Sequence, residues 1–299
     1  MIMNWELFLE KNYKKLFVVP IIMLVFSLVV VVSFYAKTGE LFYRDVSLKG
    51  GVSATIYEKG IDADKLEKFL ENKLATDVFV RKLGDIASDS DIGVVVEIGD
   101  NITDELKKLI EESTGVSLNE KNFSIEQVSS SLGESFYQGL LKAVIISFVL
   151  MGIVIFVAFR SFIPSTAVLL SAFLDIIFPL SIIELTGIKV NAAGIAAFLL
   201  VIGYSVDTDI LLTTKVLKRK EGNLYERIVD SAKTGLTMTF ATIAALGIAY
   251  FITTSFVLKQ MFLIIVIALF VDIVSTYFMN SAILIWYCKK KEKNEKFWG

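Results

Sequence analysis

Histidine is absent from the 299-residue sequence, and cysteine occurs once, at Cys288. Without histidine, imidazole zinc sites and His-based catalytic triads are excluded, so a proton carrier inside a membrane would have to be a carboxylate, a lysine or a tyrosine. A single cysteine excludes an intramolecular disulfide and a cysteine zinc site. We also find no nucleophile–base pair, metal cluster or phosphate-binding loop, and therefore expect no enzyme, no cofactor and no bound metal.

Charge is nearly balanced, with a formal net charge of −2, so the sequence gives no reason to expect nucleic acid as a partner. What the chain has in excess is apolar surface: 55% of its residues are hydrophobic and its mean hydropathy is +0.64. Composition alone therefore indicates an integral membrane protein in contact with a lipid bilayer.

Apolar runs long enough to cross about 30 Å of hydrocarbon occur six times. They cover residues 17–36, 139–159, 163–186, 190–212, 235–257 and 261–287. We interpret residues 1–16 as an N-terminal segment, 17–36 as an uncleaved anchor helix, 37–138 as a polar domain, 139–287 as five further transmembrane helices, and 288–299 as a basic tail. The other connections are short.

Basic residues in the short loops fall mostly on one side of the predicted bundle. That side holds Lys11, Lys14, Lys15, Arg160, Lys215, Lys218, Arg219, Lys220, Arg227 and the tail "CKKKEKNEK". The short loops of the other side hold Lys189 and Lys259. The positive-inside rule then predicts a multi-pass protein of the plasma membrane with both termini cytoplasmic and residues 37–138 outside.

The outside domain reads as alternating strands and helices in the order β-α-β-β-α-β, typical of a ferredoxin-like module. The strands are expected at 52–58, 77–83, 92–98 and 122–128, and the helices at 61–75 and 103–113. Gly50 and Gly51 precede the first strand, where paired glycines allow positive φ and close backbone approach, as in a tight turn. Asp85, Asp89 and Asp91 are interpreted as a solvated turn rather than a calcium loop.

Acidic residues within the apolar runs are the most informative feature, because buried charge is costly and usually faces a bundle interior or a wet cavity. The candidates are Asp175, Glu184, Asp207, Asp209 and Asp272. Asp175 lies near the middle of its helix. Asp207 and Asp209 are about 200° apart on a helix; we expect Asp207 to face the interior and Asp209 to reach interfacial water. Asp272 is interpreted as a helix-packing hydrogen-bond group.

Small residues surround these acids, in "NAAGIAA" (191–197), at Gly203 and in "TGLTMTFATIAALG" (234–247). They let helix backbones approach closely, and their hydroxyls can bond between helices. The fourth and fifth helices are therefore expected to pack tightly and to line the acids with polar groups.

Together these features resemble the SecF family, the smaller subunit of SecDF in the Sec export apparatus, which is related to resistance-nodulation-division transporters. "VIGYSVDTD" (201–209) resembles its fourth-helix signature, Gly-Tyr-Ser followed by acids, and "KGG" (49–51) resembles the double glycine that opens its outside domain. Asp175 falls where SecF proteins carry an acid in the third helix. "SAKTGLTMT" (231–239) resembles the Thr-rich start of the fifth helix.

The match departs from the bacterial pattern Gly-Tyr-Ser-x-Asn-Asp-Thr/Ser. Thr208 stands in the slot of the family's aspartate, Asp207 in that of Asn, and Asp209 in that of Thr or Ser; Lys233 stands where Arg is usual. The variant is more similar to archaeal members.

The resemblance implies a SecD partner, a SecYEG-type translocon and contact with translocating polypeptide. It further implies a proton relay through Asp207, Asp209, Asp175 and Lys233, supported by hydrogen bonds from Tyr204, Ser205 and Thr208. Two alternatives remain at this point. One is a half-size resistance-nodulation-division transporter of lipids or small amphiphiles. The other is a SecD-binding subunit without proton coupling.

Overall fold

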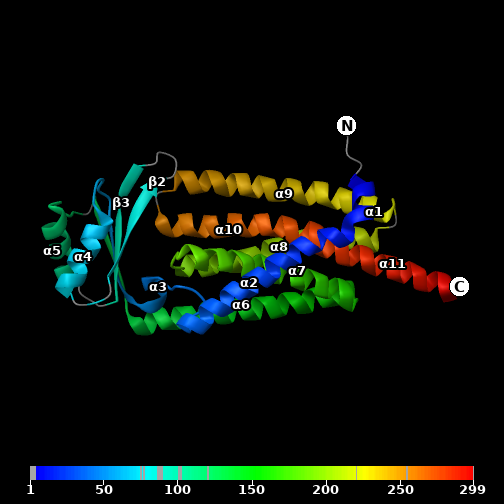
Figure 1. The fold of residues 1–299 in the computed structure, drawn as a ribbon, viewed down its shortest axis with the longest axis horizontal. Helices are drawn as coiled ribbons and strands as arrows, with labels where there is room; N and C mark the ends of the chain where they lie inside the picture. The colour runs from blue at the N-terminus through cyan, green and yellow to red at the C-terminus, as the bar shows by residue number, and fades with distance from the viewer. Residues whose placement is uncertain are drawn as a thin grey trace.

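The computed structural model describes residues 5–74, 76, 78–85, 90–99, 103–119, 121–219, 221–253 and 255–298. Long helices form a bundle that carries a small α+β domain at one end, while both chain termini lie toward the opposite end (Figure 1). This is the predicted multi-span helical protein with one ferredoxin-like domain between its first two membrane helices.

Six helical spans within the described residues are long and apolar enough to cross a membrane, as the sequence predicted. They run over Leu9–Thr38, Ser130–Phe159, Phe162–Thr186, Ala192–Lys218, Leu224–Ile252 and Val257–Glu292. The first consists of α1 (Trp5–Leu16) and α2 (Val18–Thr38), and the next four are α6, α7, α8 and α9. The last combines α10 (Phe256–Val274), the π-helix η1 (Ser275–Asn280) and α11 (Ser281–Trp298).

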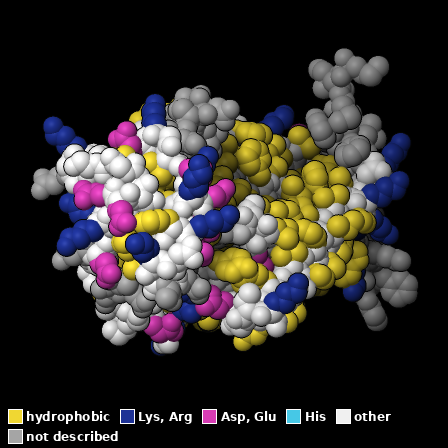
Figure 2. Space-filling view, turned by 60° about the vertical axis from the view of Figure 1, so that its left-hand side comes forward, with side chains coloured by type: hydrophobic (Ala, Val, Ile, Leu, Met, Phe, Trp, Pro, Cys, Tyr) yellow, Lys and Arg dark blue, Asp and Glu magenta, His cyan; other side chains and the backbone are white. Residues whose placement is uncertain are grey.

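Apolar side chains cover the outside of the bundle. On α6 the outward residues Ile145, Val149, Ile153 and Val157 are all more than half exposed. In the space-filling view a broad hydrophobic surface separates the α+β domain, where acidic and basic residues mix, from a rim of lysines and arginines at the far end (Figure 2). Such a band is the surface that a hydrocarbon solvent requires.

Three helices build the interior of the bundle. α7, α8 and α10 pack against one another, and their facing side chains form a buried core that includes Ile183, Ile195, Phe198, Ile264 and Leu269. α6 and α9 flank α8, and α2 packs on α7. Asn191 and Asn223 cap the starts of α8 and α9 by accepting hydrogen bonds from Gly194 and Glu226 amides.

The α+β domain, here called the sheet domain, consists of β1 (Gly51–Ile56), α4 (Ala63–Leu74), β2 (Val78–Asp85), β3 (Ser90–Ile98), α5 (Thr103–Thr114) and β4 (Phe123–Val128). The antiparallel sheet has the order β2-β3-β1-β4, with Ala54 opposite Val96 and Ile125. Leu66, Leu70, Leu106 and Ile110 pack the two helices onto one sheet face. Of the predicted acidic turn, Asp89 lies outside the described residues.

The double glycine lets the chain enter the sheet while touching the start of α6. After the short helix α3 (Val46–Lys49), Gly50 has φ 86° and Gly51 φ 124°. A Cβ on Gly50 would lie 2.3 Å from the Ser130 Cα, and one on Gly51 2.3 Å from the Ile98 carbonyl oxygen. The predicted positive φ and close backbone approach are both present, and Gly133 of α6 completes the contact.

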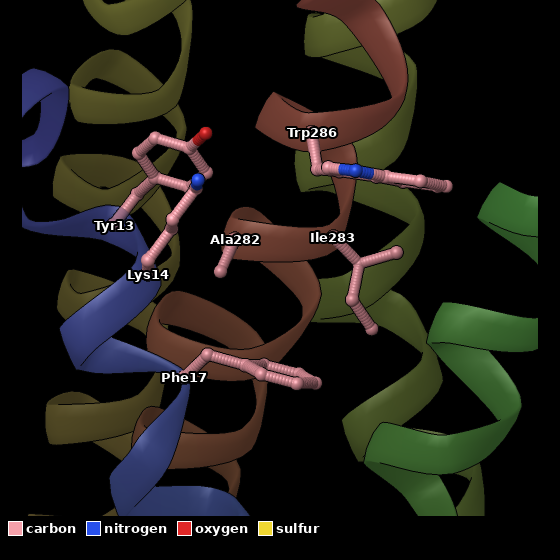
Figure 3. Close-up of a pocket in the computed structure, with 6 residues that line it drawn as sticks. All are labelled: Tyr13, Lys14, Phe17, Ala282, Ile283 and Trp286. Atoms are coloured by element: carbon pink, nitrogen blue, oxygen red, sulfur yellow. The ribbon is translucent and has the colours of Figure 1, made fainter. Parts of the chain in front are cut away.

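At the opposite end, the junction of α1 and α2 lies beside α11. Tyr13, Lys14 and Phe17 face Ala282, Ile283 and Trp286 across a mainly apolar cleft of about 360 Å³ (Figure 3). This cleft sits where the bundle meets the basic rim, a level at which membrane proteins are enriched in aromatic residues.

Candidate functional site

Three carboxylates lie together inside the bundle. Asp175 comes from α7, Asp209 from α8 and Asp272 from α10. Their exposed fractions are 0%, 0% and 1%. The three helices that form the bundle core therefore each contribute one acid to a shared polar interior.

Asp175 is held by two serines on neighbouring helices. Ser275 Oγ of η1 donates a hydrogen bond to Asp175 Oδ1 at 2.6 Å, and Ser205 Oγ of α8 donates to Asp175 Oδ2. The Ser205 carbonyl accepts a hydrogen bond from Thr208 Oγ1 at 2.8 Å, and the same hydroxyl lies 3.0 Å from Asp272 Oδ1. Ser205 thus contacts Asp175 directly and is connected to Asp272 through Thr208.

Asp209 and Asp272 are connected through threonines. Thr276 Oγ1 lies 2.9 Å from Asp209 Oδ1 and 3.2 Å from Asp272 Oδ1. Thr208 Oγ1 lies 3.0 Å from Asp272 Oδ1 and 3.4 Å from Thr276 Oγ1. Asn280 Nδ2 donates to Asp209 Oδ1 at 2.8 Å. Hydrogen bonds therefore join Asp209, Thr276 and Asp272 directly, and Thr208 connects Asp272 to the Ser205 carbonyl.

The uncharged polar residues that the last span contributes to this site come from the π-helix η1. Ser275, Thr276 and Asn280 all lie in this six-residue segment between α10 and α11. π-Helical turns are rare, and they are found frequently at functional sites because the wider turn changes the direction of side chains. Here the segment brings two hydroxyls and an amide to the acids.

Among the described residues, no lysine or arginine forms an ion pair with any of the three acids; their hydrogen-bond partners are hydroxyls and one amide. Burying charge without a counterion costs several kcal/mol. A hydroxyl has one proton to donate and can accept another, so serines and threonines between carboxylates can pass a proton from one acid to the next. The arrangement is chemically suited to holding and moving protons.

Asp207 does not face this interior, contrary to the sequence-based expectation. It lies on the exposed side of α8, whereas Asp209 is fully buried. The two acids do point in different directions, as the helical geometry requires. The expected assignment was reversed because α8 is apolar on most of its surface, so hydrophobicity alone leaves its rotation undetermined.

The other sequence candidates are spread over α8 and α9. The Tyr204 hydroxyl accepts a hydrogen bond from Thr242 of α9 at 3.2 Å. Gly203 is exposed on α8, with open space around it. Lys233 is exposed on α9, beside a cleft lined by Arg219, Asp230 and their neighbours at the terminal end of the bundle. The structure does not bring Lys233 to the three carboxylates.

Sequence reasoning missed the part of the site that follows residue 270. Asp272 does hydrogen-bond a neighbouring helix, through Thr208 of α8, as expected, and it is also a member of the acid cluster. Ser275, Thr276 and Asn280 were not singled out. The signal that could have found them is "DIVSTYFMN" (272–280), which places five polar residues in an otherwise apolar run. Such a density is unusual for a lipid-facing segment.

Comparison with known proteins assigns the chain to a family. The family described as "Protein export membrane protein SecD/SecF, C-terminal" matches residues 108–290. SecF of Pyrococcus furiosus is 31% identical over 290 residues, covering 97% of this chain and 96% of its own. SecF of Methanocaldococcus jannaschii is 36% identical over 284 residues, covering 93% and 96%.

The fold has a solved counterpart. The crystal structure of SecDF from Thermus thermophilus, a translocon-associated membrane protein, matches with a TM-score of 0.75 at 18% identity. The match covers 96% of this chain but 39% of that one. The similar SecF proteins are archaeal, as the Asp207–Asp209 register predicted. This chain belongs to the SecF family of protein-export membrane proteins, within the wider SecD/SecF family.

Proposed function

We propose that this SecF protein acts in protein export as one half of a membrane assembly whose other half is a SecD-type subunit. The solved SecDF protein supports this, because the present chain accounts for 39% of its length. A second membrane subunit would also cover a face of α8 that this chain leaves open.

That open face contains Ala196, Leu200, Gly203 and Asp207, at helical spacings of four, three and four residues. All four are exposed. A carboxylate facing hydrocarbon is costly, and small residues in a stripe allow close approach of another helix. The SecD-type partner is therefore placed against this stripe, where it would remove Asp207 from lipid.

The orientation follows from charge and from the position of the termini. Both ends of the chain lie at the end of the bundle away from the sheet domain (Figure 1), and basic residues gather there. We place the termini in the cytoplasm, the bundle in the plasma membrane and the sheet domain outside. In that position the sheet domain meets the SecYEG-type translocon and the emerging polypeptide.

Proton movement through Asp175, Asp209 and Asp272 is proposed to drive late translocation or release. The observation that carries this proposal is the burial of three hydroxyl-linked carboxylates without a cationic partner among the described residues. A change in their charge would favour one of two packings of α7, α8 and α10, and so move the sheet domain. Asp207 belongs to the partner face, and Lys233 has no assigned step.

The test is export by cells or vesicles that carry Asp175→Asn, Asp209→Asn or Asp272→Asn. Release of a secretory protein is measured with and without a proton gradient, and co-purification of the SecD-type partner reports assembly. Each variant is expected to lose gradient-dependent release by about tenfold or more while still binding the partner. Glu221→Gln, at an exposed loop position, is the control.

Asp207→Asn separates the two roles of the α8 acids. We expect it to alter partner binding more than gradient dependence. If all three buried-acid variants keep gradient-dependent release, the protein is instead a SecD-binding subunit whose acids serve packing. The single compact sheet domain argues against a half-size exporter of lipids or amphiphiles, for which larger outer domains would be expected.

A further inference from the structure

A cluster of four charged residues joins the sheet domain to the connection between α7 and α8. The Glu97 carboxylate of β3 forms ion pairs with Lys189 of that connection, at 2.8 Å, and with Arg81 of β2, at 3.0 Å. Arg81 also lies 3.7 Å from Asp45, the residue that caps α3. The Glu97 side chain is 2% exposed. Two acids and two bases from four separate segments thus meet in a mostly buried position.

Backbone hydrogen bonds connect the same segments of the chain. The Val190 amide donates to the Tyr43 carbonyl at 2.7 Å, and the Asp45 amide donates to the Val190 carbonyl at 3.0 Å. The Ala192 amide at the start of α8 donates to Ser47 Oγ at 3.2 Å. The α7–α8 connection therefore pairs like a short strand with the chain that leads into β1.

The N-terminal end of α10, the third helix that carries an acid, lies at this junction as well. Gln260, in the first turns of α10, donates from Nε2 to the Lys189 carbonyl at 2.5 Å. Its Oε1 accepts from the Asn191 amide at 3.3 Å. α7, α8 and α10, which carry Asp175, Asp209 and Asp272, are thus all fixed to one point under the sheet.

We propose that Glu97 and Lys189 are positioning residues that make the acid-bearing helices and the sheet domain move together. This inference rests on the proposed proton-driven function, and it specifies how a change of charge on the buried acids displaces the sheet domain. Helices transmit a displacement along their axes because they are stiff, and Lys189 is about 30 Å from Asp209 by helical rise. The Lys189–Glu97 pair is the side-chain link, since it joins the helix connection directly to a sheet strand.

Charge exchange tests the link in the full chain with its partner. Lys189→Glu and Glu97→Lys each place like charges together, whereas the double variant restores an opposite pair and leaves the total charge unchanged. Each single variant is expected to lower gradient-dependent release about tenfold. The double variant is expected to regain part of it, because Glu97→Lys also places a positive charge beside Arg81, which lies 3.0 Å from the Glu97 carboxylate. Lys73→Glu, at an exposed pair with Glu112 on the sheet domain, is the matched control.

Amide hydrogen exchange supplies a second readout that does not depend on export. Asp209→Asn, which fixes that acid as neutral, should change exchange of residues 43–50 in the otherwise native chain. The same substitution should leave this segment unchanged when Lys189→Glu is also present. The milder variants Lys189→Gln and Glu97→Gln replace any charge-reversal variant that does not accumulate.

Three results would each overturn the inference: the double variant regains no release, Asp209→Asn has no effect on exchange at residues 43–50, or that effect is equal with and without Lys189→Glu. The proposed function fails separately. If Asp209→Asn leaves release unchanged but still alters exchange at residues 43–50, proton-driven release is wrong while the mechanical link stands.

Discussion

At the scale of single residues, Thr276 has the most constrained chemistry. Its hydroxyl lies within hydrogen-bonding distance of both Asp209 and Asp272, yet it has only one proton to donate. When it donates to one acid it can only accept from the other, which must then carry a proton. Removal of the Thr276 hydroxyl therefore tests whether Asp209 and Asp272 share a proton or only pack against each other.

Thr276→Val removes this hydroxyl and keeps the branched shape of the side chain. We expect gradient-dependent release to fall about tenfold, and the chain to lose roughly 1–3 kcal/mol of stability because buried carboxylates lose a donor. Thr242→Val is the matched control, since Thr242 bonds Tyr204 and touches no acid. Equal release by the two variants would show that Thr276 is no part of the proton path.

Gly50 illustrates a residue whose importance is steric. We expect Gly50→Ala to lower the melting temperature in detergent markedly, because the new Cβ would overlap the Ser130 backbone and φ is positive. Gly60→Ala is the control: φ is +81° there, but no atom lies within 4 Å of the added Cβ. Gly60→Ala should cost about 1 kcal/mol, which is the conformational penalty alone. Similar losses in both variants would argue that the contact with α6 is unimportant.

At the scale of elements, the short helix α3 connects the membrane to the sheet, and Asp45 both caps it and faces charged neighbours. Burial, followed by repulsion from Glu97, raises the pKa of Asp45 to about 6, although Arg81, Lys189 and the Ser47 amide oppose this. Since the raised pKa means that the folded chain binds this proton more tightly, ionisation of Asp45 costs stability as the pH rises from about 4 to 6.

Asp45→Asn should therefore stabilise the protein at pH 7 and have little effect below pH 4. The gain at pH 7 is expected to be at most about 3 kcal/mol, from about two pKa units, since asparagine retains the helix cap. Melting temperatures of the variant and the native chain between pH 4 and 7 provide the measurement. Asp62→Asn is the control, because hydrogen bonds to Lys65 lower the pKa of this exposed cap; no gain at neutral pH is expected there.

The π-helix is the other decisive element. An uninterrupted α-helix through 275–280 would direct Ser275, Thr276 and Asn280 differently, because a π-turn contains more residues than an α-turn. In the observed geometry Ser275 reaches Asp175 while Thr276 and Asn280 reach Asp209. Because this helix is locally widened, a single segment can hydrogen-bond to acids on two other helices.

At the scale of the whole molecule, the outer surface of the bundle is not uniform. Its outer helices are mainly apolar, but the α8 stripe exposes Gly203 and Asp207. The bundle surface thus combines a broad apolar area with a stripe that carries a carboxylate, which is the face proposed above for the SecD-type partner. The junction at Lys189 and Glu97 connects the helices of the bundle interior to the sheet domain.

Gly203→Leu tests the partner face without disturbing the chain itself, since no atom lies within 4 Å of a Cβ at Gly203. Co-purification of the SecD-type subunit should fall about tenfold, equivalent to about 1.4 kcal/mol, while the melting temperature of the isolated chain stays unchanged. Gly247→Leu, in an equally open place on α9, should keep the partner bound. Retention of the partner by Gly203→Leu would place the interface elsewhere.

Several features were determined by the sequence alone. Six apolar runs predict six spans, because only segments that satisfy their own backbone hydrogen bonds can cross hydrocarbon, and alternation in 52–58 predicts a strand. The glycines at 50 and 51 indicated a close backbone approach from their residue type. These signals are local, so each could be read without knowing what lies opposite.

The tertiary structure decided which acids meet. α8 is apolar nearly all round, so its rotation, and hence the choice of Asp209 over Asp207 for the interior, depends on packing against α7 and α10. Asp272 and Thr276 joined the site through the π-helix, which local sequence does not specify. Glu97 and Lys189 are 92 positions apart; only the folded chain brings them together, because such contacts depend on the sum of all packing rather than on any neighbouring residue.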